Sequence, residues 1–238
     1  MARTLKFISA ILISSGLIIL LVVFGPLIKQ EVIFHYNKLI GTSYYIYNNG
    51  QDPNGYLKDR GGIIPESTDF GIIIPKINAN AQIFPNIDPF SEREFLPILK
   101  NGVAHAKNTS FPGHGGNIFL FAHSASSALE IQRYNAVFYL IEKLNQDDEI
   151  VIFYKEKPYY YYVFEKKIVS AGAVKYLEEE NEEVLTLQTC YPPGTTLKRL
   201  IVRAKLKDGS WQPIRKVIYM VLVSCRYSSC RQLDIKDV

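Results

Sequence analysis

The sequence predicts a mostly β domain, built as a barrel or a sandwich and preceded by one N-terminal transmembrane helix. From Asp69 onward, short β-branched or aromatic runs alternate with Gly, Pro, Asn or charged clusters, which is the pattern of strands joined by turns. Many short strands with few helices favour a single domain over about residues 67–208. A run of 22 uncharged residues near the N-terminus predicts the transmembrane helix.

The uncharged run extends over Phe7–Ile28, with the sequence FISAILISSGLIILLVVFGPLI. As a helix it spans about 33 Å at about 1.5 Å per residue, enough to cross a bilayer core of about 30 Å. Arg3 and Lys6 precede it, so the positive-inside rule places the N-terminus in the cytoplasm and the residues after Lys29 outside. The alternative is a cleaved signal peptide, whose apolar stretch is usually about 7–15 residues long. We therefore expect residues 1–29 to be a cytoplasmic stub and a retained, single-pass anchor in the cell membrane.

The segments on either side of the β domain have weaker patterns. Residues 30–66 are expected to form a juxtamembrane segment and a linker, because NNGQDPNG and KDRGG are rich in residues that favour turns. Residues 209–238 form a tail for which the sequence predicts no definite structure. Its apolar run VIYMVLV (217–223) is too short to cross a membrane, so an extra strand or a surface element is expected.

Within the domain, the sequence predicts two short helices and eight strands. The helices are Ser91–Lys100, with Ser91 as the expected N-cap and Glu94 three residues on, and about Ala136–Leu144. The strands, in chain order, are FGIIIPKI (70–77), AQIFPNI (81–87), GVAHA (102–106), NIFLFAH (117–123), EIVIFYK (149–155), YYYYVFEKKIV (159–169), VLTLQTC (184–190) and RLIVRAKL (199–206).

Three residues that can carry chemistry stand at the ends of predicted strands. Cys190 closes VLTLQTC and, with a period of two, shares a face with Thr186 and Gln188 while the leucines between them face the other way. His123 ends the run NIFLFAH. Arg199 opens RLIVRAKL, on the face opposite the apolar residues of that run.

Together these three residue types are sufficient for acyl transfer. A thiol needs a basic or cationic neighbour to become a nucleophile, and a guanidinium can stabilise the oxyanion of a tetrahedral intermediate. Singly, each has a structural interpretation: a buried Cys, a hydrogen-bonded His or a surface Arg. Arg203, on the same strand as Arg199, is expected to be a solvated charge.

Several further sequence segments carry a resemblance to a known family. TLQTC is followed nine residues after its Cys by an Arg that opens an apolar strand, which resembles the sortase signature, where TLxTC carries the nucleophile. GNIFLFAHS resembles the segment that carries the sortase histidine, and GVAHAKNTSFPGHGGN resembles the strand and loop before it. FGIIIPKINANAQI resembles the opening strands. The resemblance covers about 140 residues in the expected order.

This resemblance implies a closed sortase-type β-barrel of about eight strands with short helices, and a role for each site residue. It implies Cys190 as the nucleophile, His123 as the general acid/base and Arg199 as the group that positions the substrate carbonyl and stabilises the oxyanion. Thr189 and Ala122, which precede the Cys and the His, would line the substrate groove. His105, His114 and His35 fall outside the positions that the family uses, so we expect structural roles for them.

The implied reaction is cleavage of an LPxTG-like sorting motif and transfer of the acyl group to an amine. The expected partners are a surface-protein peptide that carries the motif and an acceptor amine, from a cell-wall precursor or a pilin Lys. The segment CYPPGT resembles the class D and class E groups more than the class A group. The mild net charge of +4 gives no indication of nucleic-acid binding.

We expect neither a cofactor nor a metal. The loop Asn108–Gly116 contains no acidic residue, whereas LEEENEE (177–183) is strongly acidic and is expected to be a solvated face, with a calcium site as the alternative. Cys225 and Cys230 can form a disulfide or stay reduced, and no His accompanies them as a zinc site would require. Two other functions remain open: another extracytoplasmic cysteine acyl-transferase such as an L,D-transpeptidase, and a barrel that binds sorting motifs without turnover.

Overall fold

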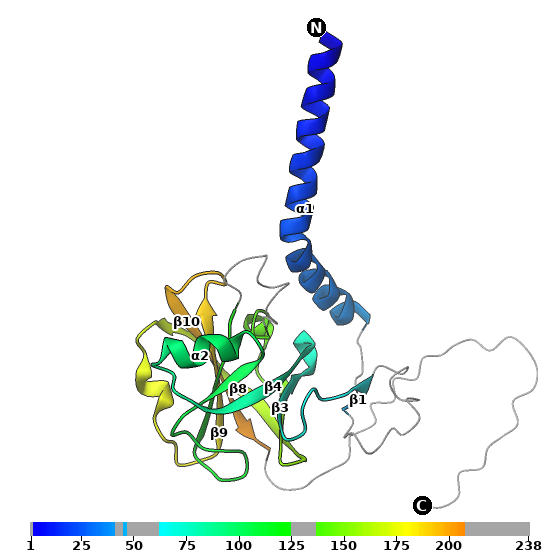
Figure 1. Cartoon of the computed structure of the whole chain (residues 1–238). Helices are drawn as coiled ribbons and strands as arrows, with labels where there is room; N and C mark the ends of the chain where they lie inside the picture. Colours follow the sequence, from blue (N-terminus) through cyan, green and yellow to red (C-terminus); the bar gives the residue numbers. More distant parts are fainter. Residues whose placement is uncertain (1, 41–44, 47–61, 125–136, 208–238) are drawn as a thin grey trace, which may run out of the picture. The chain divides into compact units, whose positions relative to one another are not determined.

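The computed structural model describes residues 2–40, 45–46, 62–124 and 137–207 (Figure 1). The tail 209–238, including Cys225 and Cys230, and most of the predicted linker lie outside the described residues. The helical elements are α1 (Ala2–Ile40), α2 (Glu92–Leu99) and the 3₁₀ turns η2 (Pro75–Ile77), η3 (Ile141–Lys143) and η4 (Val174–Leu177). The strands are β1 (Tyr45–Ile46), β2 (Gly62–Ile63), β3 (Phe70–Ile74), β4 (Ala79–Ile87), β5 (Val103–Ala106), β6 (Asn117–Phe121), β7 (Glu149–Tyr154), β8 (Lys157–Ser170), β9 (Val184–Tyr191) and β10 (Lys198–Leu206).

Eight of these strands close into one barrel, in the order β10-β8-β7-β3-β4-β5-β6-β9. The pairs β4–β5 and β6–β9 are parallel, and the other neighbouring pairs are antiparallel. Each of the eight predicted runs contributes one strand. The prediction of a mostly β fold, and of a closed barrel of about eight strands, is therefore confirmed.

The interior of the barrel is filled by alternate side chains of its strands, as a period of two requires. Leu185 and Leu187 of β9 belong to the main core, and so do Leu200, Val202 and Ala204 of β10. All five are buried. The residues between them must therefore face the outside of the barrel, which is the orientation that the sequence predicts for these two strands.

Part of the outer surface of the barrel is also apolar and is covered. Phe119 and Phe121 of β6 form a second cluster with Leu99 of α2. Tyr176 and Leu177 of η4 pack against this cluster and are partly buried. Both α2 and η4 therefore lie on the outside of the barrel, over the face from which β6 projects its aromatic side chains.

The chain just before β3 is attached to the barrel by an asparagine. Asn80 of β4 accepts a hydrogen bond from the backbone N–H of Glu66 at 2.9 Å and donates one to the carbonyl of Ile64 at 2.7 Å. Ile63 packs against the outward-facing Ile73 in a third apolar cluster. Residues 63–66, which the sequence predicts to belong to the linker, thus contact the barrel.

Of the two helices predicted within the domain, the structure contains the first but not the second. α2 forms where it is predicted, with Ser91 at the N-cap, although the Ser91 side chain makes no capping hydrogen bond. The carboxylate of Glu94 instead accepts from the N–H of Asp88 at 3.1 Å. The predicted helix at about 136–144 is wrong for the described residues, which contain only the 3₁₀ turn η3. Its aromatic and β-branched residues have modest helix propensity, and packing into the core overrides it.

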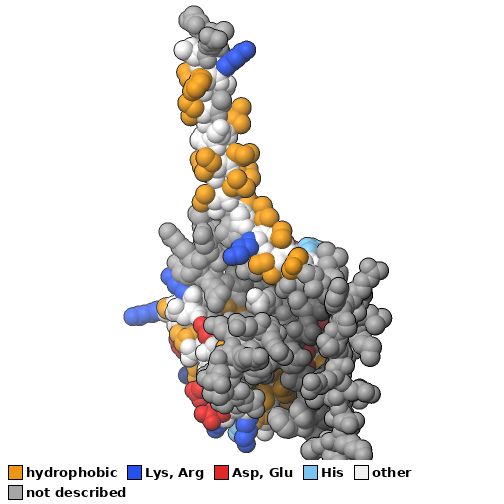
Figure 2. All heavy atoms as spheres, turned by 90° about the vertical axis from the view of Figure 1, so that its right-hand side faces the viewer, with side chains coloured by type: hydrophobic (Ala, Val, Ile, Leu, Met, Phe, Trp, Pro, Cys, Tyr) orange, Lys and Arg blue, Asp and Glu red, His pale blue; other side chains and the backbone are white. Residues whose placement is uncertain are grey.

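The N-terminal segment is helical, as predicted, and α1 contains the whole uncharged run from Phe7 to Ile28. Figure 2 shows hydrophobic side chains along its described part. Among the residues described, no helix combines the length and the apolar character needed to cross a membrane. The membrane anchor over 1–29 and its orientation stay predictions from the sequence.

Candidate active site

Cys190 lies near the end of β9 and faces the outside of the barrel. Leu185 and Leu187 project into the core, so Cys190, at the opposite parity, lies on the outer face with Thr186 and Gln188. Its thiol is free and half-buried. A half-buried thiol at a strand end is within reach of a ligand, which a Cys packed in the core would not be.

Arg199 stands directly opposite Cys190 on the neighbouring strand. The antiparallel register of β9 and β10 pairs these two residues. Directly opposed residues share a face of the sheet, with Cα atoms about 4.5–5.5 Å apart. Nη1 of Arg199 donates to the carbonyls of Thr196 and Lys198, both at 3.1 Å. These two bonds engage Nη1 and leave the Nη2 and Nε donors for other acceptors.

His123 follows β6, which runs parallel to β9 on its other side. The register of the two strands pairs Phe121 with Gln188, and the N–H of Ala122 continues the ladder by donating to the carbonyl of Gln188 at 3.2 Å. The next residues in this register are His123 and Cys190. β6 ends at Phe121, which faces outward, and His123 follows two residues later and is half-buried.

Thr189 and Ala122 connect the two strands at this level. The Thr189 hydroxyl donates to the carbonyl of Ala122 at 2.9 Å. The two side chains are only 4% and 6% exposed. This bond fixes the register of β6 against β9 one residue before His123 and Cys190. The predicted contact of Thr189 and Ala122 with a substrate stays a prediction.

The backbone thus brings Cys190, His123 and Arg199 to one end of three neighbouring strands, in the order β6, β9, β10. Cys190 and Arg199 share the outer face by strand parity, and His123 follows the outward-facing Phe121 by two residues. A thiol, an imidazole and a guanidinium at one end of the barrel provide a nucleophile, a proton carrier and an oxyanion donor. These are the three kinds of group that acyl transfer needs.

The acidic run before β9 is engaged by cations and backbone amides. Glu180 pairs with Arg203 and Glu182 with Lys205. The carboxylate of Glu183 accepts from the N–H groups of Gly113 and Gly115, each at 3.1 Å, and from the Tyr161 hydroxyl at 2.6 Å. Across the described ranges, no group of three or more His, Cys, Asp or Glu residues is placed to hold a metal ion.

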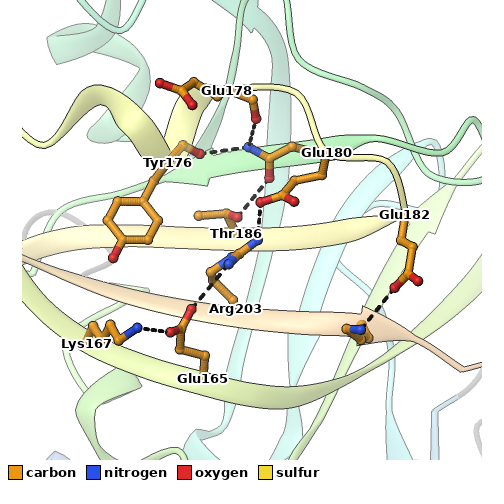
Figure 3. A network of polar contacts seen from close by, with 10 residues as sticks. Glu165, Lys167, Tyr176, Glu178, Glu180, Glu182, Thr186 and Arg203 are labelled. Carbon is orange, nitrogen blue, oxygen red and sulfur yellow. Dashed lines mark hydrogen bonds and ion pairs between the residues drawn. The ribbon is translucent and has the colours of Figure 1, made fainter.

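Arg203 is not the solvated charge that the sequence predicts. Its side chain is only 17% exposed and pairs with Glu165 as well as Glu180, and Figure 3 shows its guanidinium between the two carboxylates. The hydrogen bond from Lys167, with a further one from Arg203, lowers the pKa of Glu165 against the opposing effect of burial. The sequence offered one signal for this: a run of acids directly precedes β9, and β10, the next strand along the chain, carries Arg203 and Lys205.

The other three histidines lie away from Cys190 in the sequence, and their burial and contacts differ. His105 is fully buried; its Nδ1 accepts from the N–H of Asn86 at 3.3 Å and its Nε2 lies 2.9 Å from the carbonyl of Ser110. Burial lowers the pKa of His105, which favours the neutral ring. His114 is exposed and stacks edge-on near Tyr154, with ring centroids 6.4 Å apart. His35 is an exposed residue of α1.

Comparisons with known proteins identify the family of the domain. The family model described as Sortase domain matches residues 72–207, more than half of the chain. A search of curated proteins gives no match. Similar solved structures include a sortase D5 transpeptidase from Clostridium perfringens, with 29% identity over 58% of this chain and 78% of that chain and a TM-score of 0.48.

Two other similar structures are sortases of different classes. Sortase C from Clostridium perfringens SM101 is 28% identical over 76% of this chain and 88% of its own, with a TM-score of 0.47. A lid mutant of sortase A from Corynebacterium diphtheriae is 24% identical over 60% of this chain and 72% of its own, with a TM-score of 0.49. The match of the family model over residues 72–207 decides the assignment: this chain belongs to the sortase family.

Proposed function

We propose that the chain cleaves an LPxTG-like sorting motif through a thioester on Cys190 and transfers the acyl group to an amine. The observation that carries this proposal is the register of three strands. Arg199 is the Cα partner of Cys190, and the β6–β9 ladder, continued through Ala122, leads to His123 and Cys190 at the same level. Family membership supports the same reaction.

In the first half-reaction, the thiol proton of Cys190 passes to His123 and the thiolate attacks the scissile carbonyl carbon of the motif. The C–S bond forms and the carbonyl oxygen becomes an oxyanion, which Arg199 stabilises with its guanidinium donors. The intermediate then collapses: the C–N bond breaks, and the leaving amine takes the proton from the His123 imidazolium. The product of this half-reaction is an acyl-thioester on Cys190.

In the second half-reaction, an acceptor amine attacks the thioester carbonyl. Neutral His123 takes a proton from the attacking nitrogen, a C–N bond forms and the C–S bond breaks. The sulfur leaves as the thiolate and takes the proton back from the His123 imidazolium, which restores the starting enzyme. If water attacks instead, the same steps give a free carboxylate, so the amine must outcompete water for transpeptidation to dominate.

The acceptor amine, the sortase class and the location of the chain are further parts of this proposal. We propose that the amine comes from a cell-wall precursor or a pilin Lys, and that the sequence CYPPGT places the chain nearer the class D and class E groups than class A. The uncharged run of α1 supports a retained single-pass anchor in the cell membrane, with the catalytic domain outside. Substrate and acceptor are then both available at the outer membrane face.

The test is to incubate the full-length chain in mild detergent with a labelled LPxTG peptide and an amine. An amide product that forms with the wild type and is absent with Cys190→Ala supports the proposal. Binding of the peptide without any product, in both proteins, would instead identify a module that binds sorting motifs without turnover.

A further inference from the structure

The part of α1 that follows the uncharged run packs against the barrel. α1 and the barrel belong to one compact unit, Met1–Asp208. Phe34 of α1 is 9% exposed and belongs to the main core cluster, whereas Val32 and Tyr36 are 58% and 61% exposed. One face of this helical turn is therefore buried against the barrel at Phe34, and the opposite face is open.

The element that this helix face meets is η3. The carboxylate of Glu31, about one turn before Phe34, lies 3.4 Å from the Lys143 ammonium. The same ammonium lies 5.8 Å from the centroid of the Phe34 ring, within reach of a cation–π contact. Burial, and then the charges of Glu31 and Glu142, raise the pKa of Tyr139. The ion pair is about one third exposed on both sides, so the buried Phe34 is the stronger part of the contact.

η3 is itself attached at the end of the barrel that carries Cys190. β7, which follows η3, is antiparallel to β8, and β8 and β9 are both antiparallel to β10, so β7 begins at the end where β9 ends. The Lys166 ammonium donates to the carbonyls of Glu142 and Leu144 at 2.6 and 2.7 Å. The hydroxyl of Tyr191, the residue after Cys190, donates to the Glu142 carboxylate at 3.3 Å. The end of α1 is thus docked at the same end of the barrel as the candidate nucleophile.

Exposed apolar side chains lie at this end of the barrel as well. Ile168, near the end of β8, is 48% exposed, and Leu197, directly before β10, is 72% exposed. Lys198 begins β10 and is also exposed. Exposed apolar groups mark sites of interaction with proteins or membranes, and a lysine beside them can keep its ammonium at the polar headgroups. This composition fits a bilayer surface.

We propose that the Cys190 end of the barrel faces the bilayer surface, held there by the docking of Glu31 and Phe34 on η3. This orientation rests on the proposed function, of which the anchor formed by the uncharged run is a part. Phe34 lies six residues beyond Ile28, which is about 9 Å along a helix at about 1.5 Å per residue. A peptide with a sorting motif therefore reaches Cys190 from the membrane side of the barrel.

The test measures energy transfer from a label on the full-length chain to an acceptor dye on lipid headgroups, in vesicles of phosphatidylcholine and phosphatidylglycerol. One protein carries the label on Cys190, and a second carries it on Lys157→Cys in a Cys190→Ala background. Both also carry Cys225→Ser and Cys230→Ser. Lys157 is exposed and begins β8, at the opposite end of the barrel. The eight residues of β9 alone span about 25 Å at about 3.3 Å per residue, so transfer can distinguish the two ends.

We expect more transfer from the label on Cys190 than from the label on Lys157→Cys. Phe34→Ala removes the ring that docks on η3, so transfer from Cys190 should fall toward the value for the opposite end. Val32→Ala, on the exposed face of the same turn, is the matched control and should leave transfer unchanged. Equal transfer from the two labels, or more from Lys157→Cys, overturns the proposal, and so does an unchanged value in Phe34→Ala.

Two further measurements keep these outcomes separate. Hydrogen exchange of β9 amides shows whether the barrel of Phe34→Ala is folded. If it is not, Lys143→Glu, which reverses the charge opposite Glu31, takes its place and should lower transfer from Cys190 in the same direction.

Turnover of a soluble LPxTG peptide by the unlabelled chain tests the proposed reaction without the membrane. A chain that is active on this peptide but does not float with the vesicles has no anchor, and the orientation is then refuted with it. A chain that floats and shows the expected transfer without turnover refutes the reaction but retains the orientation.

Discussion

At the scale of single residues, Arg199 and Arg203 show how two arginines on one strand take different roles. They lie four residues apart on the outer face of β10, so their Cα atoms are about 13 Å apart at about 3.3 Å per residue. Arg203 is occupied by Glu165 and Glu180. Arg199 is opposite Cys190 and donates only to backbone carbonyls among the contacts described. Of the two, Arg199 is therefore the one that we propose to serve an oxyanion at the thiol.

The choice of Arg199 gives a prediction for conservative substitution. Arg199→Lys keeps the charge but loses the planar fork, so turnover should fall by about 10²–10³-fold, the usual effect of losing one oxyanion donor. The measurement is kcat for amide formation. Lys198→Arg, on the adjacent and exposed residue, is the control and should leave kcat unchanged. An unchanged kcat in Arg199→Lys would mean that another group stabilises the oxyanion.

His123 should be separable from Cys190 by the size of its effect. His123→Ala removes proton transfer to the leaving amine, a contribution of about 10²–10⁴-fold, whereas Cys190→Ala removes the nucleophile altogether. Residual turnover in His123→Ala, measured at saturating peptide, should therefore exceed that of Cys190→Ala. Identical rates for the wild type and His123→Ala would remove His123 from the mechanism.

At the scale of elements, the register between β6 and β9 decides whether the site exists. The Thr189 hydroxyl and the Ala122 carbonyl form a buried bond one residue before the catalytic candidates. The sequence could predict the strands and their faces, because alternation in VLTLQTC and RLIVRAKL is clear. It could not predict that β6 and β9 are neighbours in parallel register, since that pairing joins residues about 67 positions apart.

The Thr189 bond can be tested with a near-isosteric change. Thr189→Val removes the hydroxyl and leaves the Ala122 carbonyl short of a donor, which should lower the free energy of unfolding by about 1–3 kcal/mol. Chemical denaturation measures this change. Thr195→Val is the control, because the Thr195 hydroxyl bonds the Pro192 carbonyl at an exposed position and should cost less. An equal decrease in the free energy of unfolding in the two variants would show that the buried Thr189 bond contributes no more to stability than the exposed Thr195 bond.

The junction of the glycine loop with β9 is a second element-scale contact. Glu183 accepts from the N–H groups of Gly113 and Gly115 and from the hydroxyl of Tyr161, whose side chain is fully buried. Glu183→Gln removes the charge that strengthens these bonds, so the free energy of unfolding should fall by about 1.5–3 kcal/mol. Glu182→Gln, on an exposed neighbour, should change it little. A larger loss in Glu182→Gln would contradict this account.

At the scale of the whole molecule, the sequence could predict the strands of the barrel, but not the side-chain contacts between segments that are distant in the sequence. Eight apolar runs with turn residues between them are sufficient to predict strands, and all eight close one barrel. The role of Arg203 was missed because its partners come from β8 and from the segment before β9, whose proximity is a property of the closed sheet. The prediction of a helix at about 136–144 was wrong for a related reason: packing of these side chains into the core overrode their local helix propensity.

The buried His105 links the stability of the whole barrel to pH. Burial lowers its pKa in the folded state below the ordinary 6.5, so below that pH the unfolded chain binds more protons than the folded one. Its contribution to stability is therefore complete above about pH 6.5 and is lost as the pH falls toward the folded pKa. Thermal unfolding from pH 8 to pH 5 should show the decline. His105→Gln should flatten it, whereas His114→Gln, at an exposed site, should not.

The central claim is that Cys190 is the nucleophile in a site that it shares with His123 and Arg199. Its most direct test is to mix the full-length chain with an LPxTG peptide in the absence of amine, quench with acid within one turnover, and locate any acyl adduct by peptide mass spectrometry. We expect a thioester on Cys190 that disappears on addition of an amine and accumulates less in Arg199→Lys. An adduct on another residue, or turnover in Cys190→Ala equal to that of the wild type, would contradict it.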